Sequence, residues 1–165
     1  MINVGILTIS DRGSRGERVD ESSKAIREVL AQLDVDVKRY EIIPDEVDII
    51  SAELTEWADE EKLDLILTTG GTGLSPRDVT PEATLRVVDK LAPGFAEVMR
   101  SESLKITPMG MLSRAVAGVR ASTLIINLPG SPKAVRECLG AIMPALPHAV
   151  EVVRGEAVEC ATRTE

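Results

Sequence analysis

Several separated stretches of the chain carry side chains that could do chemistry together. They are Ser10-Asp11-Arg12, Pro44-Asp45-Glu46, Thr68 through Asp78, and Pro129 through Lys133. Glycine-rich backbone and basic side chains bind anions, while carboxylates hold divalent cations. We therefore expect a site for anionic, phosphate-containing small molecules, assembled from segments that are distant in the sequence.

The segment from Thr69 through Gly73 has no side-chain bulk at its three glycines, so backbone N–H groups could approach a phosphate or pyrophosphate. A tight strand-to-helix connection without a ligand is the alternative. Two common nucleotide motifs do not fit. A Walker loop would end in Gly-Lys-Ser/Thr, and a dinucleotide fingerprint would have a further glycine where Pro76 stands.

Asp45 and Asp78 are the candidate catalytic and metal-binding carboxylates. Two carboxylates from different loops could hold a hydrated Mg²⁺, which usually takes one or two protein carboxylates together with phosphate oxygens and waters. Asp45 could instead be only a turn residue after Pro44. Glu82 is a further metal candidate, although an acid in a first helical turn is also explained by the helix dipole.

Two basic residues could meet an anion in this region. Arg77 supplies a positive charge directly before Asp78. Lys133 follows Ser131-Pro132 at a predicted helix N-terminus, where the helix dipole disfavours a cation unless an anion is bound nearby. A solvent-exposed lysine without a ligand is the alternative for Lys133.

The composition excludes several classes of function. The 165 residues fit one domain over 1–165, and a net charge of −8 with a single Trp, Tyr and Phe argues against a nucleic-acid partner. Cys138 and Cys160 lack metal-type spacing, and no signal peptide or long apolar run is found, so a cytoplasmic protein without a membrane partner is expected. The lone His148 is expected to pack in an apolar stretch, which argues against a histidine-based triad.

The elements that must position these residues alternate between strand and helix patterns. Apolar runs predict strands over Asn3–Ser10, Leu63–Thr69 and Leu124–Leu128, and alternating apolar and charged residues predict a less buried strand over Val35–Ile43. Helical spacing follows each strand, with Thr80 expected as an N-cap and two short helices expected within 93–120. This alternation predicts a three-layer α/β/α domain with a mostly parallel central sheet, in which ligands bind at the carboxyl ends of the strands.

These motifs resemble those of the MogA/MoaB family of molybdenum cofactor biosynthesis proteins, which is related to the gephyrin G domain. The resemblance extends over residues 1–142 as a series of blocks in one order. The blocks are Thr8-Ile9-Ser10-Asp11-Arg12, Ile43-Pro44-Asp45-Glu46, TTGGTG at Thr68 to Gly73, RDVTPEAT at Arg77 to Thr84, PGFAEVMR at Pro93 to Arg100, LSRAVAGVR at Leu112 to Arg120 and NLPGSPKAV at Asn127 to Val135.

The resemblance implies a molybdopterin adenylyltransferase, an enzyme that transfers AMP from Mg-ATP to the terminal phosphate of molybdopterin and releases pyrophosphate. It also implies a homotrimer and a possible partner enzyme for molybdate insertion. Asp45 and Asp78 match acids that the family needs for the reaction. The residues expected to contact nucleotide or pterin are Ser10, Asp11, Arg12, Thr69, Gly70, Gly71, Thr72, Gly73, Arg77, Ser113, Pro129, Gly130, Ser131 and Lys133.

Two alternatives stay open at this stage. RDVTPEAT is closer to MogA-type sequences, whereas the AVAGV and PGS pieces are closer to MoaB-type ones. A molybdopterin-binding or carrier protein of the same fold without catalysis is therefore the first alternative. A scaffold domain, as in receptor clustering by gephyrin, is the second, because a fold does not determine a function. The motifs leave open which loop takes pterin and which takes nucleotide.

Overall fold

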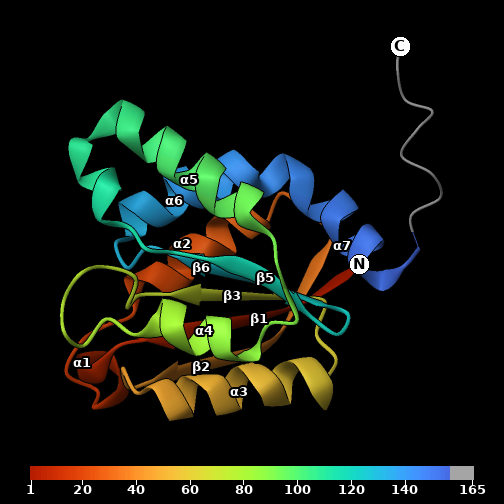
Figure 1. Cartoon of the computed structure of the whole chain (residues 1–165), viewed down its shortest axis with the longest axis horizontal. Coiled ribbons are helices and arrows are strands. Elements are labelled where there is room, and N and C mark those ends of the chain that lie inside the picture. Colours follow the sequence, from red (N-terminus) through yellow and green to blue (C-terminus); the bar gives the residue numbers. More distant parts are fainter. Residues whose placement is uncertain (157–165) are drawn as a thin grey trace.

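The apolar runs form one six-stranded sheet in the computed structural model, which describes residues 1–156 (Figure 1). The spatial order of the strands is β2-β1-β3-β6-β5-β4. Their bounds are β1 Ile2–Ile9, β2 Val35–Ile43, β3 Leu65–Thr69, β4 Lys90–Leu91, β5 Ala117–Arg120 and β6 Thr123–Leu128. Strands β2, β1, β3 and β6 are parallel, whereas β5 pairs antiparallel with both β6 and the edge strand β4, so the mostly parallel sheet is confirmed.

Helices cover both faces of this sheet, which confirms the three-layer architecture (Figure 1). One face carries α2 Glu21–Leu30, α5 Pro93–Ile106, α6 Pro132–Ile142 and α7 Leu146–Arg154, and the other carries α3 Val47–Asp59 and α4 Thr80–Val87. Each face of the sheet has its own apolar core against the helices. Successive side chains of a strand point to opposite faces, so Leu65 and Leu67 of β3 lie in the core under α2, α5, α6 and α7, and Ile66 lies in the core under α3 and α4. Short helices are α1 Asp11–Ser14, η1 Pro108–Leu112 and η2 Met143–Ala145.

The expectation of two short helices within 93–120 is confirmed only in part. Residues 93–106 form the single helix α5, the 3-10 helix η1 follows, and β5 pairs with β6 as an antiparallel hairpin. Ala121 in the connecting turn has a positive φ of 49°. With only AGVR as its sequence, β5 is too short for a period to be recognised, and its strand conformation depends on pairing with β6.

The expected N-cap of α4 was wrong. Thr80 is the first residue of the helix, and Val79 precedes it as a cap without a side-chain hydrogen bond. The Thr80 hydroxyl instead donates to the carbonyl oxygen of Gly70 at 2.9 Å. Thr80 therefore fixes the glycine segment rather than the start of its own helix. Asp11 through Ser14, which follow β1, form the short helix α1.

Other expectations concern single residues. His148 is not packed, because its side chain is 58% exposed and its Nδ1 lies 3.4 Å from Glu151 Oε2. Cys138 is buried as a free thiol, and Cys160 lies outside the described residues. Within residues 1–156, no helix has the length and apolar character needed to cross a membrane.

Candidate functional site

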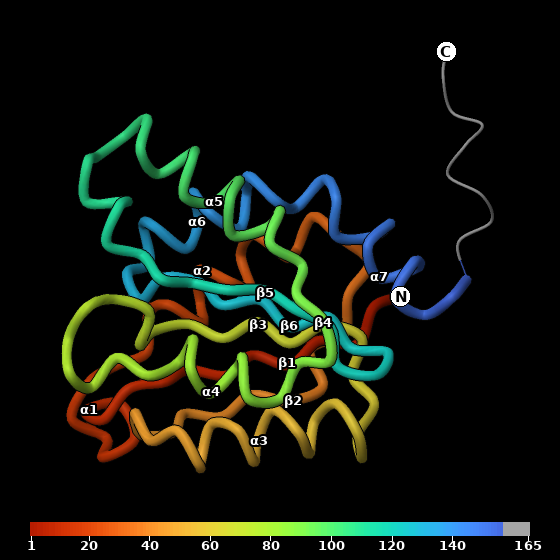
Figure 2. Tube along the Cα trace, viewed as in Figure 1, coloured from red at the N-terminus to blue at the C-terminus, as the bar shows by residue number. Residues whose placement is uncertain are grey.

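A hollow of about 390 Å³ lies where the parallel strands reach their carboxyl ends, and we call it the main hollow. Figure 2 shows α1 and the segment after β3 at this same end of the sheet. The predicted residues that line the main hollow are Ser10, Asp45, Thr69, Gly70, Gly71, Asp78, Gly130 and Ser131. The structure thus brings together loops that follow β1, β2, β3 and β6, as a parallel sheet requires.

Other predicted residues lie around the main hollow without lining it. They are Asp11, Arg12, Thr72, Gly73, Arg77, Glu82 and Lys133. Pro129 and Ser113 line a second hollow of about 260 Å³, which also reaches Ser131. Since Ser131 lines both hollows, the two hollows are adjacent and the loop after β6 lies between them. The wall of the second hollow includes the sulfur-containing side chains of Met99, Met109 and Cys138.

The loops after β1 and β2 are joined by a reciprocal pair of hydrogen bonds between Asp11 and Asp45. The Asp11 amide donates to Asp45 Oδ2 at 2.9 Å, and the Asp45 amide donates to Asp11 Oδ1 at 3.1 Å. Ser10 accepts from the Gly13 amide at 3.0 Å and so caps α1. The position of Asp45 therefore depends on α1 as well as on its own strand.

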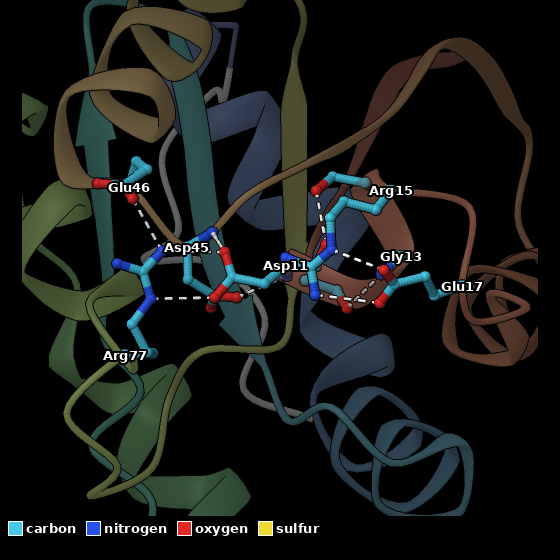
Figure 3. A network of polar contacts seen from close by, with 9 residues as sticks. Asp11, Gly13, Arg15, Glu17, Asp45, Glu46 and Arg77 are labelled. Carbon is cyan, nitrogen blue, oxygen red and sulfur yellow. Dashed lines mark hydrogen bonds and ion pairs between the residues drawn. The ribbon is translucent and has the colours of Figure 1, made fainter.

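Arg77 forms ion pairs with acidic residues (Figure 3). Its side chain does not line the main hollow. Its Nε and Nη2 donate to the two carboxylate oxygens of Asp11 at 3.0 and 2.9 Å, and Nη2 also donates to Glu46 Oε1 at 2.8 Å. These hydrogen bonds lower the pKa of Asp11 and raise the pKa of Arg77. The expected ligand-binding cation is thus engaged in holding Asp11, which in turn holds Asp45.

The surroundings of Asp45 disfavour its charge. Burial raises the pKa of Asp45, and the nearby negative charges of Asp11 and Asp78 add to the rise, although the hydrogen bond from the Asp11 amide and the charge of Arg77 offset part of it. Asp78 approaches the same hollow from the opposite loop, with Oδ2 accepting from the Ser75 amide at 3.0 Å. A cation between Asp45 and Asp78 would relieve this repulsion, so this pair fits a bound divalent ion.

Glu82 does not join that pair. Arg114 forms an ion pair with its carboxylate, and this hydrogen bond lowers the pKa of Glu82. Within residues 1–156, no cluster of three or more His, Cys, Asp or Glu residues is arranged to hold a metal. The expected role of Glu82 as a metal ligand therefore has no support in its position, because its charge is already neutralised outside the main hollow.

The glycine segment has strong packing requirements of its own. Gly70 and Gly71 have φ values of +96° and +66°, which favour glycine. A side chain at Gly70 would collide with the Ile9 carbonyl oxygen, and one at Gly71 would collide with the Thr80 hydroxyl. These glycines thus serve the tight connection between β3 and the following loop, and they also leave the floor of the main hollow open.

Sequence reasoning missed Asp20 on the wall of the main hollow. Burial opposes its ionisation, but hydrogen bonds from Thr8, Ser23 and Tyr40 outweigh it and lower the pKa of Asp20. Thr8 Oγ1 donates to Asp20 Oδ2 at 2.6 Å, and the Ser23 amide donates to Oδ1 at 3.0 Å. The sequence did place Asp20 directly before a helical pattern, where an aspartate acts as an N-cap, but this position does not by itself indicate a binding site.

Lys133 lies at the start of α6, as expected, but it does not line either hollow. Its side chain is 80% exposed, and Nζ lies 3.9 Å from Glu137 Oε1. Ser131 caps the helix, accepting from the Ala134 amide at 3.2 Å. These positions favour the alternative of a solvent-exposed lysine in this conformation.

Comparisons with known proteins show which family the chain resembles. The family described as "Probable molybdopterin binding domain" matches residues 5–148. The molybdopterin adenylyltransferase of Helicobacter pylori J99 is 51% identical over 156 residues, covering 93% of this chain and 89% of that protein. The molybdopterin adenylyltransferase of Escherichia coli K12 is 40% identical over 174 residues, covering 97% of this chain and 89% of that protein. The crystal structure of the molybdopterin biosynthesis enzyme MoaB from Thermus thermophilus superposes with a TM-score of 0.91 at 58% identity, covering 96% and 100%.

Proposed function

Because the chain belongs to the MogA/MoaB family of molybdenum cofactor biosynthesis proteins, we propose that it is a molybdopterin adenylyltransferase. The reaction joins AMP from ATP to the terminal phosphate of molybdopterin. The observation that carries the proposal is the convergence of Asp45, Asp78 and the glycine segment at one hollow, beside a second hollow that shares Ser131. Two adjacent spaces suit a reaction that brings two substrates together.

In this reaction an oxygen of the molybdopterin phosphate attacks the α-phosphorus of ATP. The bond from that phosphorus to the oxygen bridging the α- and β-phosphates breaks, and pyrophosphate leaves with the electron pair. No protein nucleophile is required, so catalysis consists of positioning and of offsetting negative charge. The fixed loops around Asp45 and Asp78 provide such positioning.

The carboxylates of Asp45 and Asp78 would hold Mg²⁺, with ATP phosphates and waters completing its coordination. When bound, Mg²⁺ would neutralise phosphate charge and stabilise the charge that develops during transfer. The raised pKa of Asp45 supports this assignment, because a neighbouring cation would favour its ionised form. We accordingly assign the nucleotide phosphates to the main hollow and the pterin to the second, less polar hollow.

The test is to incubate the purified protein with Mg-ATP and molybdopterin and to measure pyrophosphate. We expect release that requires both substrates and stops when Mg²⁺ is chelated. ATP alone is the control, since ATP hydrolysis would release pyrophosphate without molybdopterin. No release in the presence of all three components would contradict the proposal.

A molybdopterin-binding protein without turnover is the second candidate function, favoured by the family description, "Probable molybdopterin binding domain", which names binding alone. The same incubation separates the two candidates. Tight molybdopterin binding without pyrophosphate release would support the binding protein. Asp45 and Asp78 favour the enzyme, because pterin binding alone gives no reason for two carboxylates beside a phosphate site.

Lys133 is expected to contribute little to the binding of molybdopterin. Lys133→Ala should weaken binding less than about fivefold, since Lys133 lines neither hollow and a single exposed charge contributes about 1 kcal/mol or less to an ionic contact. Fluorescence titration with molybdopterin measures this effect. Lys105→Ala is the matched control, because Lys105 is also exposed and pairs with Glu102 on its own helix. A loss above about tenfold for Lys133→Ala alone would restore its expected role in phosphate capture.

We also propose that the protein is a cytoplasmic homotrimer that passes its product to an enzyme for molybdate insertion. Exposed apolar side chains around α5 and η1 support self-association through this region, which includes Val98, Leu104, Ile106, Met109 and Met111. Light scattering should give three times the mass of 17.7 kDa. A monomeric mass would contradict the trimer.

A further inference from the structure

Arg114 forms several hydrogen bonds with the loop that carries Asp78, which we call the Asp78 loop and define as residues 72–79. Its Nε donates to the Gly73 carbonyl oxygen at 2.7 Å, and its Nη2 donates to the Asp78 carbonyl oxygen at 2.8 Å. Nη1 pairs with Glu82, and the backbone amide of Arg114 donates to the Thr72 carbonyl oxygen at 2.8 Å. One residue thus joins both ends of the loop to the start of α4.

The carboxylate of Asp78 depends on the shape of this loop. Asp78 Oδ2 accepts from the Ser75 amide at 3.0 Å, and the Asp78 amide donates to the Ser75 carbonyl oxygen at 2.9 Å. The residues from Leu74 through Arg77 are exposed and form neither helix nor strand. Arg77 ties the exposed part of the loop to Asp11 and Glu46, while the rigid planar guanidinium of Arg114 connects the two ends of the loop.

Arg114 is itself held from the opposite side. Arg100 of α5 donates from Nη1 to the Ala115 carbonyl oxygen at 2.8 Å, and Asn127 Oδ1 of β6 accepts from the Val116 amide at 3.2 Å. Arg100 and Ala115 also line the second hollow, as Ser113 does. Residues 113–116 therefore lie between the two hollows, with their backbone fixed to α5 and β6 and the Arg114 side chain fixed to the Asp78 loop.

We propose that Arg114 is a positioning residue for adenylyl transfer, which holds the Asp78 carboxylate at the edge of the main hollow. This inference rests on the proposed function. Arg114 does not line either hollow, so it acts through Asp78 and not on a substrate. Glu82, in this arrangement, orients the Arg114 guanidinium and does not bind metal.

The experiment compares Arg114→Ala and Arg114→Lys with the wild type. A small displacement of a catalytic group costs about a hundredfold in rate, so Arg114→Ala should lower kcat by about that factor. The KM for molybdopterin and its directly measured affinity should change less than about threefold, because Arg114 touches neither substrate. Arg114→Lys keeps the charge but cannot bridge Gly73 and Asp78, so it should also lose kcat.

Arg120→Ala is the matched control. Arg120 donates from Nε and Nη2 to Asp59 at 3.0 and 2.6 Å, and from Nη1 to the Val87 carbonyl oxygen at 2.8 Å. It therefore makes the same kinds of contact as Arg114, but at the opposite end of β5. Arg120→Ala should lower the melting temperature without lowering kcat.

Each outcome bears on one proposal or on both. If Arg114→Ala does not fold, Arg114→Lys carries the comparison. Wild-type kcat in Arg114→Lys would overturn the positioning role while leaving the adenylyltransferase intact. A parallel loss of kcat and molybdopterin affinity would also overturn it, because it would indicate a general loosening of both hollows. A wild-type protein that releases no pyrophosphate would overturn the proposed function and this inference together.

Discussion

Replacing Asp78 by alanine is expected to lower the rate of pyrophosphate release at least about a hundredfold while leaving the fold intact. Removing one group that stabilises transition-state charge typically costs this much. The fold should survive, because Asp78 is only partly buried and its carboxylate accepts a single backbone hydrogen bond, from Ser75. Steady-state kinetics with Mg-ATP and molybdopterin, together with thermal melting, measure both effects.

Two further variants separate charge from structure at Asp78. Asp78→Asn keeps an oxygen for the Ser75 amide and removes the charge, so it should be as inactive as Asp78→Ala and melt closer to the wild type. Asp89→Ala is the matched control, because the exposed Asp89 also accepts one backbone hydrogen bond, from Ala121 at 2.7 Å. Near-normal turnover in Asp78→Asn would remove the Asp78 charge from the mechanism.

Asp45→Asn is expected to be inactive and more stable than the wild type. Its activity should fall at least about a hundredfold, because the charge that would hold Mg²⁺ is lost. Its stability should rise, because burial and the negative charges of Asp11 and Asp78 make ionisation of Asp45 unfavourable in the folded protein. The asparagine side chain still accepts from the Asp11 amide through its oxygen. Each kcal/mol gained would raise Tm by about 2–4 °C in a protein of this size.

The pH dependence of this gain follows from the raised pKa of Asp45. Below its ordinary pKa of 3.8 the carboxyl is protonated in both the folded and unfolded states, so the charge has no cost. Above the raised pKa, Asp45 is ionised in both states, and the full free-energy cost of holding its charge in the folded protein is present. The Tm advantage of Asp45→Asn should therefore be largest near neutral pH and shrink as the pH falls towards 3.8.

Asp11 provides the opposite case for comparison. Its hydrogen bonds from Arg77 lower its pKa, so its charge stabilises the fold above its ordinary pKa and that contribution is lost as the pH falls. Asp11→Asn should accordingly lower Tm at neutral pH, whereas Asp45→Asn raises it. Melting curves of both variants at several pH values test the contrast. A lower Tm for Asp45→Asn at neutral pH would show that its ionised carboxylate stabilises the fold.

Much of the fold and part of the site could be predicted before the structure. The strand Val35–Ile43 has the expected bounds, and Asp45 and Asp78 line one hollow although they lie in different loops. The hairpin formed by β5 was missed, because a strand of four residues has too few positions for a burial pattern to be seen. Asp20 was missed because a capping aspartate and a site aspartate have the same local signature.

The sequence by itself determined the architecture and the end of the sheet at which the site lies. Buried apolar runs and helical spacing are local properties, and parallel strands necessarily bring the loops at their carboxyl ends together. Only the tertiary structure decided which charges pair. Arg77 binds Asp11, Glu82 binds Arg114, and Lys133 remains outside both hollows. The physical reason is that an ion pair depends on the distance between side chains in different loops, and that distance is set by how the whole sheet and its helices pack.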